Sequence, residues 1–303
     1  MSRATLRIKI GSYTGDGSAS RTISGVGFQP KLVFFLPNTG TSNVFKLDVM
    51  PRNTISYQGS VADNTAGGIV HDFFYDGFTI GSSTGVNGNG VLYCYMAIAG
   101  SSEVLATGTY IGDGADDRNY TDASKIGFTP TFLYLRPSNA GGAFRTSVDT
   151  GDSASPVNSG NATTNYIQSL YSGGFQLGSS ANTNANAIRH WYWALGRTDS
   201  SFFKAGTFTG NGTGQSITGV GFTPDFLWVK SRGGTAGSEQ PTVWMSGYPT
   251  GYAKRLNAVA SSNDAITSVD TDGFTVGTQA GVNESGDTIQ YIAIKQGNWI
   301  YTP

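Results

Sequence analysis

The sequence predicts an all-β protein built from three tandem antiparallel β-sandwiches. The motif Gly-Phe-x-Pro occurs three times, at residues 27–30, 127–130 and 221–224, and a run of bulky apolar residues follows each copy. A Gly-Asp-Gly or Gly-Asn-Gly turn precedes each copy, at residues 15–17, 112–114 and 210–212. The copies lie roughly 100 residues apart, which is the length of a small β-sandwich. Aromatic residues make up 12% of the chain and 43 residues are glycine, as expected of strands joined by tight turns.

Each copy of the motif predicts a corner through which the chain enters a buried strand. Proline has no N–H and favours extended backbone at the residue before it. Glycine before the phenylalanine allows a tight bend in the incoming chain. We therefore interpret the corner residues as structural, with each phenylalanine plugging its corner: Phe28, Pro30, Phe128, Pro130, Phe222 and Pro224.

The first half of the first repeat contains three expected strands. Apolar residues alternate with polar ones over residues 5–10, which predicts a half-buried strand. Residues 32–36 are apolar throughout, so we expect a central strand that is buried on both faces. Residues 43–50 predict a further strand.

The second half of the repeat contains a turn and a closing strand. Residues 76–81 read as a tight turn leading into a strand, and the glycine- and asparagine-rich segment 86–90 is typical of a β-hairpin. Residues 91–99 form the expected closing strand. Its two faces should carry Leu92, Cys94, Met96 and Ile98 on one side and Tyr93, Tyr95 and Ala97 on the other.

The same order recurs in the rest of the chain, with tight turns at 172–178 and 272–277 and closing strands at 190–195 and 289–294. We therefore place three β-sandwich domains at residues 1–100, 101–198 and 199–303, the third with a short C-terminal tail. The linkers, 100–102 and 196–199, are short, so we expect the repeats to pack against one another. No helical periodicity of useful length interrupts the pattern.

Composition argues against several classes of function. The formal net charge is −1 and no basic stripe is visible, so nucleic-acid binding is not expected. His71 and His190 are the only histidines, which disfavours zinc sites and histidine-based catalysis. Cys94, the single cysteine, lies in an apolar strand and is expected to be a buried, inert thiol. No run has the length of a membrane span or a signal peptide, so we expect cytoplasmic synthesis and no membrane association.

The candidate binding residues lie in the segments that differ most between repeats: 37–70, 136–169 and 231–267. Variable loops on a shared scaffold commonly carry binding. The third segment has a cluster of aromatic and hydrogen-bonding residues, Trp244, Tyr248, Tyr252, Arg255 and Asn257. Such a set offers a sugar ring a flat apolar face and polar partners, although the rings are equally suited to filling a gap between repeats or contacting a neighbouring chain. For Trp191 and Trp193 we favour core packing.

Other chemistry receives little support from the sequence. Asp113, Asp116 and Asp117 share one turn, where calcium is an alternative to a solvated Asx-type turn, and we favour the turn. Asp72 neighbours His71, but adjacent residues of a strand point to opposite faces. We expect no cofactor and no metal. Paired carboxylates on distant loops, as in glycoside hydrolases, stay open as the weakest alternative.

A family resemblance is clearest in the third repeat, at residues 208–212, 221–230 and 272–277. These segments resemble the lectin-like repeats of tailed-bacteriophage virion and tail-fibre proteins, and the resemblance extends over the whole chain in three copies. It implies jelly-roll or lectin-like sandwiches in a virion part rather than an enzyme.

We therefore expect a non-enzymatic virion structural protein, in a capsid decoration, a head fibre or a tail fibre. Its expected partners are capsid or tail proteins and other copies of the chain, with no nucleic acid and no membrane. The first alternative is a host-attachment adhesin that recognises a cell-surface glycan. The weakest alternative is a polysaccharide depolymerase.

Overall fold

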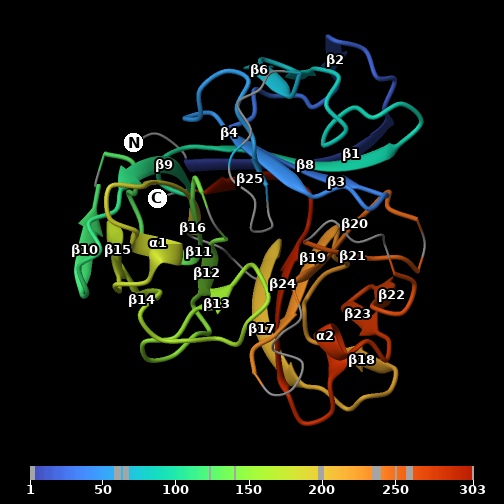
Figure 1. Cartoon of the computed structure of the whole chain (residues 1–303). Coiled ribbons are helices and arrows are strands. Elements are labelled where there is room, and N and C mark those ends of the chain that lie inside the picture. The colour runs from blue at the N-terminus through green and yellow to red at the C-terminus, as the bar shows by residue number, and fades with distance from the viewer. Residues whose placement is uncertain are drawn as a thin grey trace.

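The fold is all-β and antiparallel, as predicted. The computed structural model describes residues 4–57, 63, 68–122, 124–139, 141–196, 201–233, 240–249, 251–256 and 262–301. Within these ranges the elements are strands, β1 to β25, and two single-turn helices, α1 (Ala181–Asn184) and α2 (Ala280–Asn283) (Figure 1). Every pairing between these strands is antiparallel.

Three large sheets share one strand order. The first runs β1 (Ala4–Thr14), β8 (Leu92–Gly100), β3 (Leu32–Pro37), β4 (Val44–Leu47), β5 (Ser56–Tyr57). The second runs β9 (Leu105–Ile111), β16 (Arg189–Gly196), β11 (Pro130–Pro137), β12 (Ala143–Thr146), β13 (Ser155–Pro156). The third runs β17 (Phe203–Thr209), β24 (Thr288–Ile294), β19 (Phe226–Ser231), β20 (Thr242–Met245), β21 (Lys254–Arg255). The closing strand of each unit (β8, β16 or β24) therefore lies between the unit's first strand and the strand that follows the corner.

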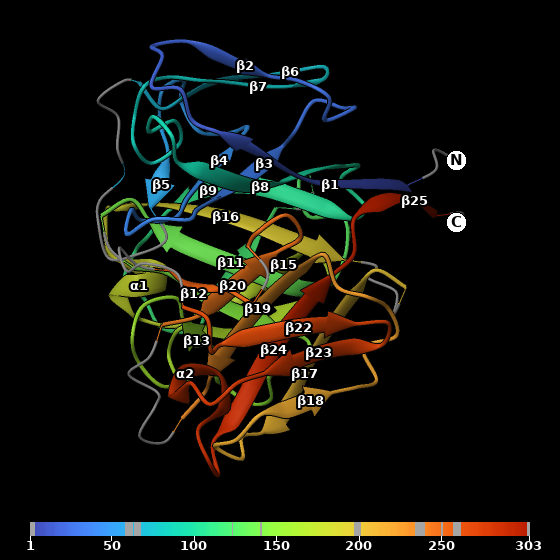
Figure 2. The same ribbon diagram turned by 90° about the vertical axis from the view of Figure 1, so that its right-hand side faces the viewer.

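A three-stranded sheet covers one face of each large sheet. The small sheets are β2 (Arg21–Ile23), β7 (Gly77–Ile80), β6 (Val70–Phe74); β10 (Arg118–Thr121), β15 (Gly174–Leu177), β14 (Ile167–Tyr171); and β18 (Gln215–Ile217), β23 (Gly273–Val276), β22 (Ile266–Asp270). Figure 2 shows the third of them lying across β24, β19 and β17. We call the described parts of residues 1–100, 101–198 and 199–303 unit 1, unit 2 and unit 3. That the units superimpose as one fold stays a prediction.

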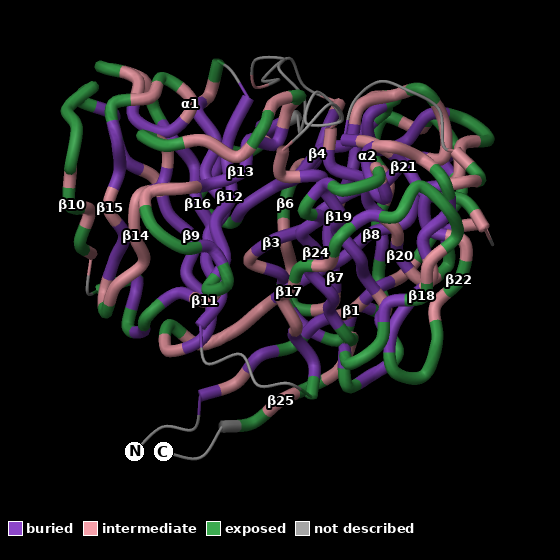
Figure 3. The backbone as a smooth tube through the Cα atoms, turned by 90° about the horizontal axis from the view of Figure 1, so that it is seen from below, coloured by how far each residue is buried: buried purple, intermediate pink, exposed green. Residues whose placement is uncertain are grey.

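Two kinds of core follow from the alternation of side chains along the large sheets. In β8, Tyr93, Tyr95 and Ala97 face the small sheet of unit 1. Cys94 and Met96 face a central core that the large sheets of all three units share. The predicted assignment of the two faces of this strand is confirmed. Figure 3 shows buried backbone concentrated where the large sheets meet.

Aromatic side chains fill the central core. Phe34 meets Phe226 at 6.2 Å between ring centroids, Phe45 meets Tyr134 at 5.4 Å, and Tyr134 meets Trp228 at 6.1 Å. Trp191 and Trp193 are buried there, as predicted. Because each unit contributes rings to one cluster, separating the units would expose apolar surface on all three.

The two ends of the described chain meet in one sheet. β25 (Gly297–Tyr301) pairs with β1, placing Trp299 opposite Leu6 and Asn298 opposite Arg7. The N- and C-termini accordingly lie close together (Figure 1). This pairing adds a sixth strand to the large sheet of unit 1 and ties unit 3 to it.

The predicted corners are buried in all three units. The exposed fractions of Phe28, Phe128 and Phe222 are 6%, 5% and 4%, and the three following prolines, Pro30, Pro130 and Pro224, are buried. In units 1 and 3 the side chain of an aspartate accepts two hydrogen bonds from the backbone of the corner. Asp76 accepts from the N–H groups of Gly25 and Gly27. Asp272 accepts from those of Gly219 and Gly221. Unit 2 instead uses a local turn in which Lys125 N and Ile126 N donate to Asp122 O.

Two local predictions are wrong. The strand expected at 43–50 ends at Leu47, because the chain turns so that Met50 N donates to Leu47 O. The hairpin expected at 86–90 is absent, since β7 and β8, the strands on either side, belong to different sheets. Asn87 is fully buried there rather than exposed at a hairpin tip.

Asn87 belongs to a buried polar latch that occurs in each unit. Its side chain accepts from Asp16 N at 3.0 Å and donates to Asp16 Oδ1 at 2.9 Å and to Ser18 O at 3.1 Å. Asn184 binds the turn at Asp113, and Asn283 the turn at Asn211, in the same way. All three amides are fully buried, so each Gly-Asp/Asn-Gly turn is held by an asparagine from far along the chain.

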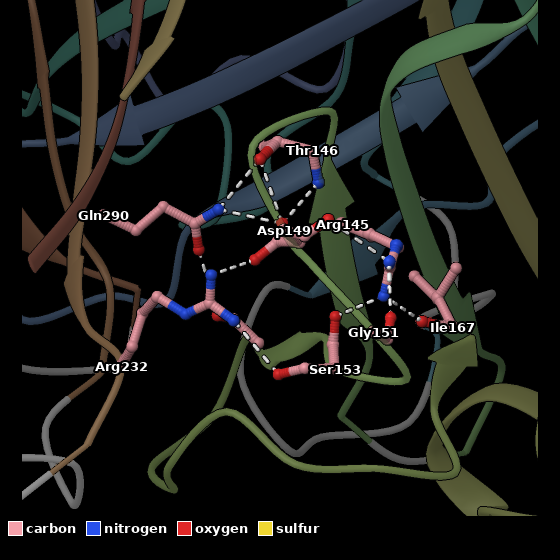
Figure 4. A network of polar contacts seen from close by, with 9 residues as sticks. Arg145, Thr146, Asp149, Gly151, Ser153, Ile167, Arg232 and Gln290 are labelled. Carbon is pink, nitrogen blue, oxygen red and sulfur yellow. Dashed lines mark hydrogen bonds and ion pairs between the residues drawn. The ribbon is translucent and has the colours of Figure 1, made fainter. Parts of the chain in front are cut away.

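A polar network joins units 2 and 3 (Figure 4). Gln290 Nε2 donates to Thr146 Oγ1 and to Asp149 Oδ2, both at 2.9 Å. Arg232 forms an ion pair with the same aspartate and donates to Ser153 Oγ at 3.0 Å. Buried charge-assisted bonds of this kind fix how two surfaces fit together.

Candidate functional site

The predicted aromatic residues of the third middle segment lie in unlike surroundings. Tyr248 is only 4% exposed, lies in the central core and donates through its hydroxyl to Pro37 O of unit 1 at 3.3 Å. Of the alternatives that the sequence left open, Tyr248 therefore follows the structural one, because its ring fills the gap between units 3 and 1. Tyr252 is 41% exposed, and Trp244 is partly exposed at the edge of the large sheet.

The other two residues of the predicted set contribute less. Arg255 lies in β21, and its carbonyl accepts a hydrogen bond from Asn43 of unit 1 at 2.9 Å. Asn257 lies outside the described residues. The structure thus brings Trp244 and Tyr248 together at one site but does not place Arg255 there.

That site is a groove of 340 Å³ between the turn after β20 and the edge strand β22. It is lined by Trp244, Ser246, Gly247, Tyr248, Gly251, Ile266, Thr267, Ser268 and Val269, which we call the unit 3 groove. Trp244 packs against both the core of unit 3 and the central core. Only part of the indole is therefore available to a ligand, and the protein holds it in place.

Strand register identifies the equivalents of Trp244 in the other units. Leu227 pairs with Trp244 in the large sheet of unit 3, Val33 with Lys46 in unit 1, and Leu133 with Arg145 in unit 2. Two residues further on, the backbone N–H groups of Ser246, Asp48 and Ser147 donate to equivalent carbonyls at the corners. A tryptophan thus stands where the other units have a cation.

In units 1 and 2 the cation is buried beneath the turn and binds its carbonyls. Lys46 Nζ donates to Met50 O at 3.3 Å and to Pro51 O. Arg145 donates to Gly151 O at 2.7 Å and to Ile167 O at 3.0 Å, which joins the turn to the edge strand β14 (Figure 4). Burial lowers the pKa of Lys46 to about 8 and also lowers the pKa of Arg145. These cations are structural, since their donors are directed at backbone.

Unit 1 has a matching groove of 210 Å³ with different chemistry. It is lined by Gln29, Lys46, Asp48, Met50, Arg52, His71, Asp72 and Phe73. Arg52 and Asp72 form an ion pair across it at 3.0 Å. The register of β6 and β22 against β7 and β23 makes His71 and Asp72 the equivalents of Thr267 and Ser268. The unit 1 groove is charged, whereas the unit 3 groove is aromatic and hydroxylated.

The remaining sequence candidates form structural contacts. Asp113 Oδ1 accepts from Ala115 N at 3.0 Å in the Asx-type turn that we favoured, and Arg118 forms an ion pair with Asp113 at 3.2 Å. His71 Nδ1 contacts Asn53 Oδ1. Cys94 is buried, as predicted, and burial raises the pKa of its thiol to about 12. Among the described residues no three or more His, Cys, Asp or Glu are grouped to hold a metal ion.

The sequence alone did not reveal the hydroxyl side of the groove. It also did not reveal that Lys46, Arg145 and Trp244 occupy equivalent positions. Ser246, Thr267 and Ser268 are common residue types, and the middle segments lack similarity that would align them. The available signal was positional: Lys46, Arg145 and Trp244 each follow a short apolar run after the corner strand. Recognising these three residues as structurally equivalent requires the strand register of the large sheets.

Comparison with known proteins adds one finding to this geometry. No curated protein matches the chain. No helix of the described residues is long and apolar enough to cross a membrane. Residues 198–299 match the model of a domain of unknown function, DUF7483, so the match spans unit 3 and includes every residue that lines its groove.

Proposed function

We propose that this chain is a non-enzymatic structural component of a bacteriophage virion, in a capsid decoration, a head fibre or a tail fibre. Three sandwich units around one core make a body in which no unit is free to hinge independently. The pairing of β25 with β1 supports the same view, because it joins the two ends of the described chain. The resemblance of the repeats to phage virion repeats supports the proposed location.

The observation that carries the binding role is the unit 3 groove. Its described lining holds a partly exposed indole, three aliphatic hydroxyls and the phenol of Tyr248, which donates to Pro37 O, but no carboxylate, imidazole, thiol or amine. A hydroxyl becomes an effective nucleophile when an adjacent general base activates it, and none of these groups lies in the described lining to serve as that base. The groove is therefore suited to holding a partner rather than transforming it.

Immunogold electron microscopy tests the location. Antibodies raised against the recombinant chain should label the head or tail surface of phage particles released from the culture that carries the gene. Antiserum depleted with the same chain provides the control. Label confined to particle-free lysate would refute the virion assignment.

A polysaccharide-release assay tests the non-enzymatic role. The purified chain, incubated with host capsule or cell-wall polysaccharide, should liberate no oligosaccharide. Release that a single Asp or Glu substitution abolishes would establish a hydrolase instead.

A further inference from the structure

We propose that the unit 3 groove binds a neutral saccharide, with one sugar ring stacked on the indole of Trp244. The inference rests on the proposed binding role and names the class of ligand at that site. It comes from the comparison of equivalent positions in the three units.

The first step is the loss of charge at the groove. In unit 1 the equivalent positions are Lys46, Asp48, His71 and Asp72, and in unit 3 they are Trp244, Ser246, Thr267 and Ser268. Every ionisable side chain of this set has been replaced by an indole or a hydroxyl. A charged ligand entering the unit 3 groove would lose hydration without meeting an opposite charge.

The second step is the space that accompanies the change. The groove measures 340 Å³ in unit 3 and 210 Å³ in unit 1, and in unit 2 Arg145 bridges from the turn to Ile167 O. The larger volume falls within the range of small-molecule sites. Gly247, with φ 89°, and Gly251, with φ 77°, contribute backbone but no side chain to the lining of the groove.

The third step selects a saccharide over a wholly apolar partner. An indole offers a flat apolar face, which suits the C–H face of a pyranose ring. Ser246 and Ser268 offer hydroxyls that can donate and accept, whereas Thr267, whose hydroxyl donates to Thr275 O at 3.2 Å, can only accept; together they suit the hydroxyl edge of the same ring. An aliphatic or aromatic partner would displace the water that is hydrogen-bonded to these hydroxyls and would offer no hydrogen bond in its place. Each hydroxyl left without a partner would cost binding free energy.

The binding experiment uses the full chain and saturation-transfer NMR. The probes are maltotriose, cellotriose and chitotriose at about 10 mM, which would nearly saturate a site with a Kd of 1 mM. Trigalacturonic acid serves as the charged comparison. We expect saturation of ring C–H protons in at least one neutral probe and none in the acidic one.

Two groups of variants locate the binding. Trp244→Arg, which copies unit 2, should weaken binding at least about tenfold, whereas Trp244→Phe should retain most of it. Ser246→Ala with Ser268→Ala should weaken binding without touching the apolar core. Ser216→Ala, an exposed serine on β18, is the matched control and should bind as the unchanged chain does. Urea titration confirms that each variant is folded, and the serine pair keeps the test valid if Trp244→Arg does not fold.

The outcomes separate the two proposals. Absence of binding to all three neutral probes, preference for the acidic probe, or binding that survives both Trp244→Arg and the serine pair would overturn the saccharide assignment. Particle labelling is read independently of these spectra. If the antibodies label particles but the chain binds no sugar, the virion role stands and the saccharide assignment is refuted. If the chain binds sugar but the particles are not labelled, the saccharide assignment stands and the virion role is refuted.

Discussion

Replacing Asn184 by alanine should lower the free energy of unfolding by about 3 kcal/mol. The side-chain oxygen accepts from Asp113 N at 3.1 Å and from Arg118 Nη1 at 3.0 Å. The amide nitrogen donates to Asp113 Oδ1 at 2.9 Å and to Ala115 O at 2.8 Å. Each such bond contributes roughly 0.5–1.5 kcal/mol net. Four bonds lost from a fully buried amide, partly replaced by water at the exposed turn, give the stated value.

Urea unfolding followed by fluorescence measures the loss as a shift in midpoint at constant slope. Asn186→Ala is the matched control, because Asn186 lies two residues further on in the same loop and is exposed. It should change stability by less than about 0.5 kcal/mol. Equal effects of the two substitutions would contradict the latch.

Asn184→Asp separates geometry from hydrogen-bond donation. The substitution keeps the shape but places a carboxylate against Asp113 Oδ1 and Ala115 O, which accept hydrogen bonds from the amide. The pKa of the new carboxyl should therefore rise on folding, so the variant is most stable below its unfolded pKa and loses stability as the pH rises. A variant that is no less stable at pH 7 than at pH 4, relative to the unchanged chain, would refute the donor role of the amide.

Three further predictions concern unit 3. Phe222→Ala should cost about 3–5 kcal/mol in unfolding free energy, because the ring is 4% exposed in the corner. Tyr248→Ala should cost a similar amount, whereas Tyr248→Phe, which removes only the bond to a carbonyl of unit 1, should cost about 1 kcal/mol. Hydrogen bonds from Gly221 N and Gly219 N lower the pKa of Asp272, so its contribution to stability is present above about pH 4 and is lost as the pH falls through the lower folded pKa.

Urea titrations measure the free energy of unfolding for the first two of these predictions. NMR of the side-chain carboxyl measures the pKa of Asp272 for the third. A cost below about 1 kcal/mol for Phe222→Ala would mean that the corner is exposed. Equal losses for the two substitutions of Tyr248 would mean that the hydroxyl, rather than the ring, holds unit 1 and unit 3 together. An Asp272 carboxyl that titrates at or above pH 4 would show that the glycine amides do not bind it in solution.

The scaffold was predictable from the sequence because its rules are local. Alternation along 91–99 assigns each side chain of β8 to one of two cores, and Phe28 and Pro30 mark a corner that the structure buries. These signals depend on neighbouring residues only. The burial of Asn87 depends instead on Asp16 and Ser18, which lie far from it along the chain.

The site was predictable only in part, for the same reason. Trp244 stood out as an aromatic residue in a variable segment, and it does line a groove. Tyr248 stood out equally, yet it packs into the central core, because the neighbouring unit supplies Pro37 O as its partner. Whether an aromatic residue of a loop faces solvent or another unit depends on how the units pack, which no local pattern encodes.

The position shared by Lys46, Arg145 and Trp244 explains how one scaffold accommodates different uses. It lies beside the edge strand of the small sheet and beneath a turn, so a change there alters the groove. A cation at this position binds the turn carbonyls, and in unit 1 it leaves the smaller groove of 210 Å³, at the cost of burying a charge. The indole of Trp244 replaces a side chain that hydrogen-bonds to the turn carbonyls, and packing against the core of unit 3 and the central core holds it in place. Unit 3 therefore has a larger, uncharged groove where unit 1 has a smaller, charged one, and this difference is the basis of the saccharide binding that we propose for it.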